Sequence, residues 1–318
     1  MSIARRNFVF SLASLLQHMQ SGGFSDQELP GTMPAEAMRV VKNGAAVTAF
    51  AAFEHFVRAR LNELLDELSS APNGPNFDNL PAGMKKAATI GALEGVRFQL
   101  RRATDVDEKV RMALNEFDRV ARNLSGGKAS FSSYTFGFAA SNVDGSVLRE
   151  FLKACDASKL NDQYADFLSA LEFDVGAVGL YSPSGSFDLQ NMALWRHESA
   201  HDASVVLDAS ILKSRVHAYL ALACAFDVFA SRAVQELIVN AEANSRRALE
   251  THGVQICNIR PSGIGEKMRV DEDGGAEYFA FEQCADEFGR RSLLGAGDSV
   301  VVKRDRENFL VDWFFCSR

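Results

Sequence analysis

The sequence lacks the cysteine pattern of a disulfide-bonded or zinc-ribbon protein. It has five cysteines, an odd number, and no Cys-x-x-Cys occurs among them. They stand far apart, at Cys155, Cys224, Cys257, Cys284 and Cys316. Disulfide frameworks use an even number of cysteines, and structural zinc sites use closely spaced pairs. The simplest prediction is therefore a cytoplasmic protein with reduced thiols.

The sequence also lacks an apolar run long enough to cross a membrane. Near the N-terminus, Arg5 and Arg6 precede a short apolar segment that ends at Gln17, and no small-x-small cleavage site follows. A twin-arginine export signal needs a longer apolar region and such a site. We therefore predict an amphipathic first helix and no contact with a membrane. The apolar face of this helix comprises Phe8, Leu12, Leu15, Leu16 and Met19.

An excess of positive charge is absent too. The formal net charge of the 318 residues is −7, which excludes a broadly basic protein that coats nucleic acid. An RNA enzyme with one local basic pocket remains possible, because the field that acts on the substrate is local. Hydrophobic residues make up 47% of the chain, which is ample for a buried core.

Apolar periodicity predicts that most of the chain is helical. The expected helices cover residues 34–68, 82–103, 105–124, 146–155, 162–172 and 208–250, and another begins near Asp188 and carries residues 196–201. Asp105 is a predicted N-cap, with Glu108 three residues later as its capping-box partner. The alanine-rich spacing of residues 45–52 favours close packing of a neighbouring helix.

The composition and the periodicity of the sequence change after residue 252. Glycine, charged residues and alternating apolar positions replace the helical period, and residues 299–303 and 308–315 read as two strands joined by a charged turn. A short helix is expected near residues 281–292. The predicted fold class is mainly α, with a helical domain over residues 1–252 (core about 35–250) and a small β-rich domain over residues 253–318.

Residues 196–202, with the sequence Arg-His-Glu-Ser-Ala-His-Asp, contain two overlapping motifs. From His197, the pattern His-Glu-x-x-His is that of zinc peptidases. From Arg196, a polar residue follows the arginine directly and a histidine stands five positions after it, at His201. That second pattern is typical of metal-independent ribonucleases. The two motifs need different chemistry and different surroundings.

The zinc-peptidase interpretation needs His197 and His201 on one helix face, which a spacing of four residues provides. Glu198 would act as the base beside a metal-bound water. Two features oppose this interpretation. Asp202 follows the second histidine, where zinc-peptidase helices usually have an uncharged residue, and Leu207 stands where a third histidine ligand is expected. The remaining candidates for a third ligand are Asp208, Asp227, Glu236 and Glu242.

The ribonuclease interpretation rests on Arg196 and His201. In this chemistry the 2′-hydroxyl of RNA attacks the adjacent phosphate, and His201 takes the proton from that hydroxyl or gives one to the leaving 5′-oxygen. Arg196 holds the phosphate bidentately and stabilises its growing negative charge. The products are a 2′,3′-cyclic phosphate and a 5′-hydroxyl. Neither a metal ion nor another cofactor is required.

An arginine followed by Asn, Asp or His, with a second histidine four to six residues further on, resembles the signature of the HEPN superfamily, and His197 fits its second position. The wider context resembles the RiboL-PSP-type HEPN domains. Three further stretches are similar to helices of that family, and the resemblance covers about residues 35–250. They are AAVTAFAAFEHFVRARLNELL (45–65), FGFAASNVDGSVLREFLKAC (136–155) and SRVHAYLALACAFDVFASRAV (214–234).

The resemblance implies a HEPN-like α-helical bundle that forms a homodimer. Two copies of the motif then face each other across a two-fold axis and make one composite active site. It further implies an RNA substrate, a role in toxin–antitoxin or antiviral-defence systems, and an antitoxin or sensor protein as a partner. Catalysis would fall to Arg196, His201 and His197.

Three carboxylates are supporting candidates. Glu54, on the early helix, is placed to orient His201 or Arg196, or forms an ordinary ion pair between helices. Glu198 and Asp202 lie within the motif itself. The alternatives that remain are a zinc-dependent peptidase that uses His197 and His201 as ligands, and a HEPN-type interaction module without catalysis.

Overall fold

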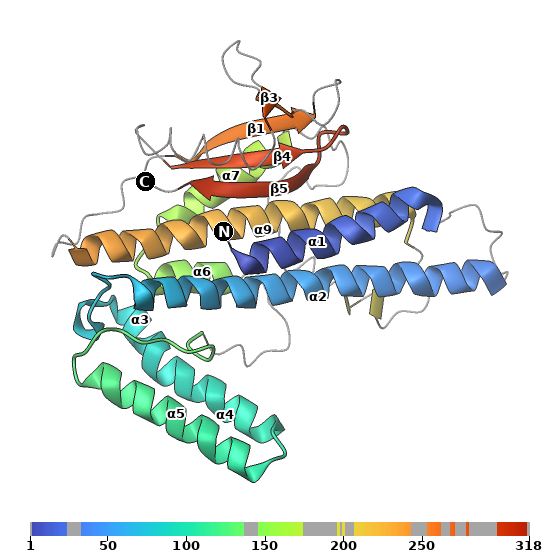
Figure 1. The fold of residues 1–318 in the computed structure, drawn as a ribbon. Helices are drawn as coiled ribbons and strands as arrows, with labels where there is room; N and C mark the ends of the chain where they lie inside the picture. Colours follow the sequence, from blue (N-terminus) through green and yellow to red (C-terminus); the bar gives the residue numbers. More distant parts are fainter. Residues whose placement is uncertain are drawn as a thin grey trace. The chain divides into compact units, whose positions relative to one another are not determined.

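The protein is mainly helical and has a small β-sheet near its C-terminus (Figure 1). The computed structural model describes residues 2–23, 33–136, 146–173, 196–197, 199–200, 207–242, 253–261, 268–270, 278–279 and 298–316. Within these residues, the predicted fold class is confirmed: a helical body followed by a β-rich region. No described helix is apolar over a length that would take it through a bilayer.

The helices begin and end close to the predicted positions. They are α1 (Ile3–His18), the π-helical turn η1 (Met19–Gly23), α2 (Met33–Ser70), the 3₁₀ turn η2 (Phe77–Asn79), α3 (Ala82–Lys86), the π-helical turn η3 (Ala87–Gly91), α4 (Ala92–Arg102), α5 (Val106–Leu124), α6 (Ser146–Ala154), α7 (Leu160–Phe173) and α9 (Ala209–Glu242). The single helix expected over 82–103 consists of α3, η3 and α4. The predicted helix near 281–292 lies outside the described residues.

The sheet contains five strands: β1 (Gln255–Pro261), β2 (Met268–Val270), β3 (Tyr278–Phe279), β4 (Ser299–Arg304) and β5 (Leu310–Cys316). Their order is β3-β2-β1-β4-β5, and only the β1–β4 pair is parallel. The predicted hairpin is confirmed as β4–β5, with Val302 opposite Trp313. The Asp305 carboxylate stabilises its turn by accepting hydrogen bonds from the N–H groups of Glu307 and Phe309.

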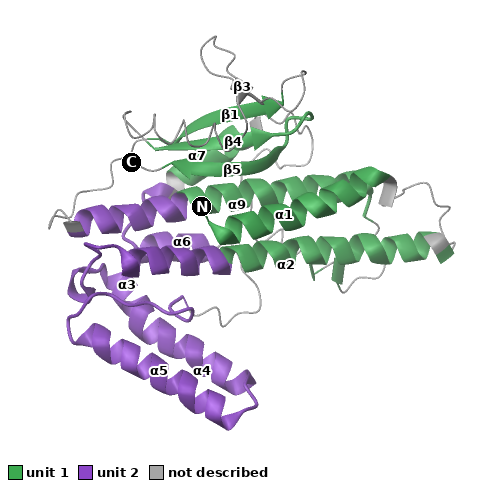
Figure 2. Cartoon of the chain, in the orientation of Figure 1, with its two compact units in different colours: residues 1–57, 162–228, 252–318 green, residues 58–161, 229–251 purple. Residues whose placement is uncertain are grey.

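Two compact units divide the chain (Figure 2). Unit 1 comprises residues 1–57, 162–228 and 252–318, and unit 2 comprises residues 58–161 and 229–251. The sheet thus falls in the same unit as α1 and the first part of α9. This division differs from the domain boundary predicted at residue 252, and independent folding of residues 253–318 stays a prediction.

In unit 1 the sheet and the helices share one core. Trp313 of β5 is fully buried, with its ring 6.5 Å from Phe8 of α1 and 6.0 Å from Phe56 of α2. Its indole N–H donates a hydrogen bond of 2.9 Å to the buried carboxylate of Asp227 on α9. Buried aromatic rings of this size dominate the energetics of a core. The apolar face predicted for the first helix is confirmed by the burial of Phe8, Leu12 and Leu16.

A fully buried arginine ties the sheet to α7. The Arg304 guanidinium donates to the Asn258 side chain, to the backbone carbonyl of Asn308 and to that of Leu171. A buried charge without such partners would be costly. Arg304 therefore joins β1, the β4–β5 turn and α7 within unit 1.

In unit 2, α3 packs directly on α6. A Cβ at Gly83 would lie only 2.6 Å from the Cα of Ala154, so glycine allows the two backbones to approach this closely. Phe151 of α6 is fully buried and meets the ring of Phe136 edge-on. The side chain of Arg60 on α2 donates a buried hydrogen bond of 2.9 Å to Ser231 on α9.

Candidate functional site

The described part of the motif is helical and belongs to unit 1. Residues 196–197 and 199–200 are in helical conformation. Arg196 is half-buried and Ser199 is buried, whereas His197 and Ala200 are exposed. Because residues three apart share a helix face, Arg196 and Ser199 lie on the inner face and His197 on the outer one. Glu198, His201 and Asp202 lie outside the described residues.

After the motif, the next described residue is Leu207, which lies in the core of unit 1. Leu207 is buried with Leu212 of α9 against Ala45 and Ala46 of α2, in a cluster that also contacts Met19. The alanine-rich segment of α2 thus permits the close packing that its spacing predicted. Ser199 contributes a buried hydroxyl oxygen that has no hydrogen-bond partner. The inner side of the motif therefore faces protein rather than solvent.

Glu54, the supporting carboxylate on α2, is half-buried and lies near Tyr219 of α9 in unit 1. Burial raises the pKa of Tyr219, the Arg215 charge lowers it, and the Glu54 charge raises it further. Tyr219 also packs on Phe53, with ring centroids 5.7 Å apart. The predicted approach of Glu54 to His201 falls outside the described residues and stays a prediction.

The described residues contain no group of three His, Cys, Asp or Glu side chains that could hold a metal ion. Asp227, one of the possible third zinc ligands, is buried and accepts the hydrogen bond from Trp313. This carboxylate therefore has a structural role in the core. Asp208, another candidate, is exposed. The zinc interpretation depends on His201 and Glu198 and therefore remains untested.

Two buried cysteines are unsuited to nucleophilic chemistry. Burial raises the pKa of the Cys155 thiol, whose sulfur lies 3.8 Å from that of Met84. Burial also raises the pKa of the Cys224 thiol, and the nearby Asp227 charge raises it further. Because the thiolate is the nucleophile, these two side chains act as small apolar groups of the core.

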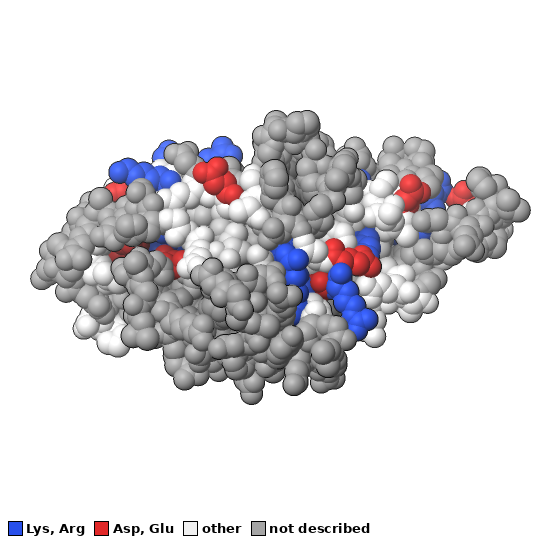
Figure 3. All heavy atoms as spheres, turned by 90° about the horizontal axis from the view of Figure 1, so that it is seen from above, with Lys and Arg blue, Asp and Glu red and all other residues white. Residues whose placement is uncertain are grey.

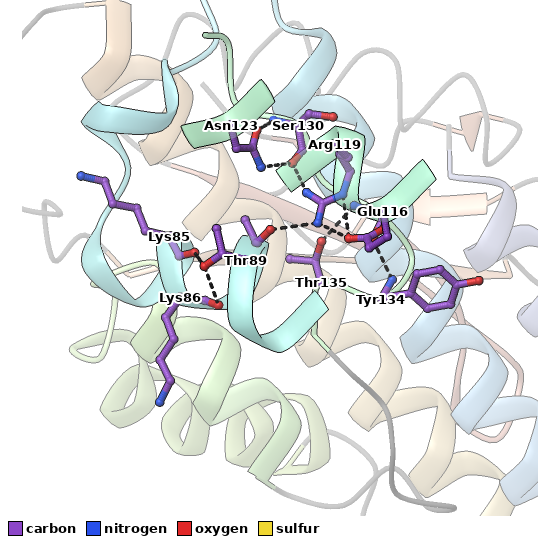
Figure 4. Close-up of polar contacts among 11 residues, drawn as sticks. Lys85, Lys86, Thr89, Glu116, Arg119, Asn123, Ser130, Tyr134 and Thr135 are labelled. Carbon is purple, nitrogen blue, oxygen red and sulfur yellow. Dashed lines mark hydrogen bonds and ion pairs between the residues drawn. The ribbon is translucent and has the colours of Figure 1, made fainter. Parts of the chain in front are cut away.

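Unit 2 contains a buried polar network around Arg119 of α5 (Figure 4). The guanidinium is paired with the Glu116 carboxylate and donates to the backbone carbonyls of Ala88 and Ser130. The Asn123 side chain donates to the same Ser130 carbonyl and accepts from the Ser130 N–H. These hydrogen bonds are made within the fold, so the network holds α5 in place and is not a binding site.

On the face drawn in Figure 3, the described basic residues do not gather into one broad surface. Figure 3 shows one face of the molecule, on which acidic and basic side chains are interspersed. Arg97, Arg101 and Arg102 are exposed on α4, and the guanidinium of Arg102 lies over the Phe98 ring. The Lys85 and Lys86 side chains extend away from the polar network of Figure 4. Recognition of a phosphate would therefore rely on a local group such as Arg196.

Sequence reasoning missed an apolar surface on α5. Five of its large apolar side chains are exposed: Val106, Val110, Leu114, Phe117 and Leu124. Their spacing of three, four or seven residues is visible in the sequence, and it predicts one continuous stripe along a helix. The sequence does not show that this stripe faces solvent, because an amphipathic helix normally buries its apolar side.

The chain was also compared with protein-family models, with curated proteins and with solved structures, and none of them matched.

Proposed function

We propose that the protein is a metal-independent endoribonuclease whose catalytic residues are Arg196 and His201, with His197 beside them. The observation that carries this proposal is the placement of Arg196 and His197 on one helical segment of unit 1. Arg196 is half-buried, so the surrounding protein restrains its guanidinium, while the exposed His197 leaves the segment accessible to a large substrate. The Arg-x4-His motif supplies the remaining support.

The proposed reaction needs one group that moves protons and one that stabilises charge. The His201 imidazole takes the proton from the 2′-hydroxyl, whose oxygen then attacks the adjacent phosphorus. The 5′-oxygen of the next nucleotide leaves and is protonated by a second acid, for which His197 or the partner protomer's motif is the candidate. Arg196 donates two hydrogen bonds to the phosphate, which strengthen as negative charge accumulates. The RNA ends as a 2′,3′-cyclic phosphate and a 5′-hydroxyl.

The same proposal includes a homodimer with a composite active site, a toxin or antiviral-defence role, and an antitoxin or sensor partner. These features rest on the resemblance to HEPN domains. We also propose that the protein acts in the cytoplasm, where RNA is available. Cys155 and Cys224 support this location, because they are buried thiols outside any disulfide and such thiols persist in a reducing compartment.

The decisive variant is Arg196→Ala. We expect it to lower the rate of RNA cleavage by about 10²–10³-fold, as loss of one group that stabilises a transition state does in other enzymes. Arg196→Lys should rescue little, because lysine cannot donate the bidentate pair. Arg101→Ala on α4 is the matched control, since that arginine is exposed and lies in unit 2. Cleavage of a labelled single-stranded RNA, with analysis of the product ends, measures the effect.

The zinc-peptidase alternative makes opposite predictions for the same set of proteins. Glu198→Ala should abolish a peptidase but leave most of a ribonuclease, and a chelator should stop only the metal-dependent enzyme. Cleavage at the full rate in Arg196→Ala would refute our assignment. Loss of activity on chelation, with recovery on addition of zinc, would establish the alternative.

A further inference from the structure

Helix α5 buries a polar face and exposes an apolar one. Its buried residues are Glu116, Arg119, Val120 and Asn123. The large apolar residues of its opposite side are open to solvent: Val106, Val110, Leu114, Phe117 and Leu124, with exposed fractions between 51% and 68%. We refer to these five residues as the α5 stripe. An exposed apolar patch of this kind marks an interaction surface on a folded protein.

The α5 stripe is narrow and runs the length of the helix. At 100° per residue, its five side chains fall within an arc of about 80°, and a helix of this length spans roughly 28 Å. Ala121, which is exposed, lies in the same arc. A narrow apolar stripe along a whole helix is the geometry of a contact between two helices that pack side by side.

The orientation of α5 is set by the polar network on its inner face. Arg119 is paired with Glu116 and donates to two backbone carbonyls, and Asn123 bonds the backbone at Ser130. Rotation of α5 to bury the stripe would break all of these bonds and expose or strand a buried ion pair, which is costly. The stripe therefore stays outside as long as this network holds, and the residues that the structure describes leave it open to solvent.

Charged residues beside the stripe indicate which molecule that is. Asp107, Arg111, Asp118 and Arg122 follow one edge of α5 and are exposed, and Asp118 and Arg122 form an ion pair within the isolated helix. Their signs alternate, and the pairs Asp107–Arg122 and Arg111–Asp118 are both centred between Leu114 and Asn115. When two copies of one helix pack antiparallel about a two-fold axis at that centre, each acidic residue faces a basic residue of the other copy.

We propose that the α5 stripe is a homodimer interface, in which two copies of α5 pack antiparallel about an axis near Leu114 and Asn115. The apolar positions have a similar symmetry about an axis one residue further along, between Asn115 and Glu116. That axis pairs Leu114 with Phe117 of the other copy, and Val110 with Ala121. In the antiparallel arrangement the N-terminus of each helix lies beside the C-terminus of the other, so the two helix dipoles attract each other. A symmetric contact of this type is the commonest form of homodimer.

The contact is modest in size. Two α5 helices together would bury on the order of 1,000 Å², which lies at or below the lower limit of specific interfaces. The dimer is therefore expected to dissociate in the micromolar range. The inference uses only residues of unit 2 and goes beyond the proposed ribonuclease, because the interface does not depend on the motif at 196–201 or on any catalytic activity.

The first test compares oligomeric state across concentration by sedimentation velocity, with the full-length chain. We expect the wild-type protein to show a reversible association step that is separate from any dimer formed through the motif at 196–201. Phe117→Glu should raise the dissociation constant of this step by roughly tenfold or more, because burial of an unpaired charge at the centre of an interface is costly. Phe10→Glu is the matched control, since Phe10 is 73% exposed on α1 and lies away from the stripe in sequence. Circular dichroism verifies that both variants fold.

The second test uses charge to identify the occupant as a second, antiparallel copy. Arg111→Asp alone places like charges opposite each other twice per dimer, and Asp118→Arg alone does the same. Each variant should therefore associate more weakly than wild type. An equimolar mixture of the two should recover association, because every contact in the mixed dimer again joins unlike charges.

Four outcomes overturn the proposal. The first is a wild-type chain that remains monomeric up to submillimolar concentration. The second is self-association that Phe117→Glu weakens no more than Phe10→Glu does, which would place the interface elsewhere. The third is a mixture of Arg111→Asp and Asp118→Arg that associates no better than either variant alone. Binding of a monomeric wild-type chain to lipid vesicles through Phe117 would likewise assign the stripe to a membrane surface instead.

Discussion

At the residue scale, His217 is a histidine that the core holds in its neutral form. It lies on the apolar helix α9, and the structure shows that it is buried. The ring stacks on Phe309 of the β4–β5 turn, with centroids 4.0 Å apart. Burial lowers the pKa of His217 from 6.5 to about 4. The nearby Asp305 charge acts in the opposite direction and raises this pKa, whereas the Lys213 charge lowers it further. The apolar stack therefore excludes the charged imidazolium.

This burial predicts a specific loss of stability in acid. The unfolded chain binds a proton at His217 as the pH falls below 6.5, whereas the folded chain does so only near pH 4. Acidification therefore favours unfolding across this window, by roughly 3 kcal/mol at its lower end. His217→Phe should remove that contribution while keeping an aromatic ring against Phe309. Urea unfolding at pH 7.5 and at about pH 4.5, where most of this window has been crossed, measures the difference.

The control for this effect is His55→Gln, because His55 is exposed on α2. It should leave the acid destabilisation of the wild-type protein unchanged. Acid also protonates carboxylates, so the informative quantity is the difference between His217→Phe and wild type, not the total loss. If His217→Phe and the wild-type protein lost the same free energy of unfolding between the two pH values, a neutral, buried His217 would be contradicted.

At the element scale, helix boundaries follow from the sequence but the buried face of a helix does not always do so. Asp105 was predicted as the N-cap of α5, and its side chain does accept a hydrogen bond from the N–H of Asp107. The C-terminus of α5 is followed by Gly126 with a φ of +79°, a conformation that favours glycine. Local chemistry sets these ends. The choice of face depends on Arg119 and its distant partners, which no local pattern shows.

The same distinction applies to the strands. The β4–β5 hairpin was predicted because its two strands are adjacent in sequence and rich in β-branched and aromatic residues. The short strands β2 and β3 and the parallel pairing of β1 with β4 were not predicted. Parallel pairing joins Cys257 to Val301 across a long separation in sequence, and it is determined by packing rather than by a turn signal.

The Glu116–Arg119 pair predicts a large effect from a small change in α5. Glu116→Gln leaves the buried Arg119 charge without its carboxylate, and we expect a loss of about 3–5 kcal/mol in the free energy of unfolding. Glu36→Gln on α2 is the matched control, since it breaks a more exposed pair with Arg39 and should cost less than about 1 kcal/mol. Denaturant unfolding monitored by circular dichroism compares the two. Similar losses in both variants would show that the α5 network contributes little.

At the scale of the whole molecule, the candidate site shows which of its features the sequence can predict and which require the structure. The motif at Arg196 was recognisable because its residues are adjacent in the chain. The structure adds that Arg196 is half-buried and His197 exposed, and that the chain beyond the motif packs on Ala45 and Ala46 through Leu207. These facts depend on tertiary packing between α2 and the start of α9, so periodicity could suggest close contact there but not which side of the motif faces inward.

The sheet of unit 1 was predicted to form a small domain over residues 253–318, and Trp313 of its edge strand β5 lies in the core that the helices form. Trp313 contacts Phe8 and Phe56 and donates to Asp227. Trp313→Ala should therefore cost about 3–5 kcal/mol, typical of a large aromatic residue removed from a core. Because Phe8 and Phe56 are helical residues, the helices of unit 1 should lose protection together with the strands.

Native-state hydrogen exchange can resolve this prediction by element. In Trp313→Ala, amides of β4, β5, α1 and the first part of α9 should all exchange faster by a similar factor, since one cooperative unit opens as a whole. Phe10→Ala, at an exposed position of α1, should change exchange little, as surface substitutions usually alter stability by less than about 0.5 kcal/mol. Faster exchange confined to β4 and β5 would show instead that residues 253–318 form a separately folding domain. That result would support the boundary predicted at residue 252, and the contacts of Trp313 would then join two separately folding domains.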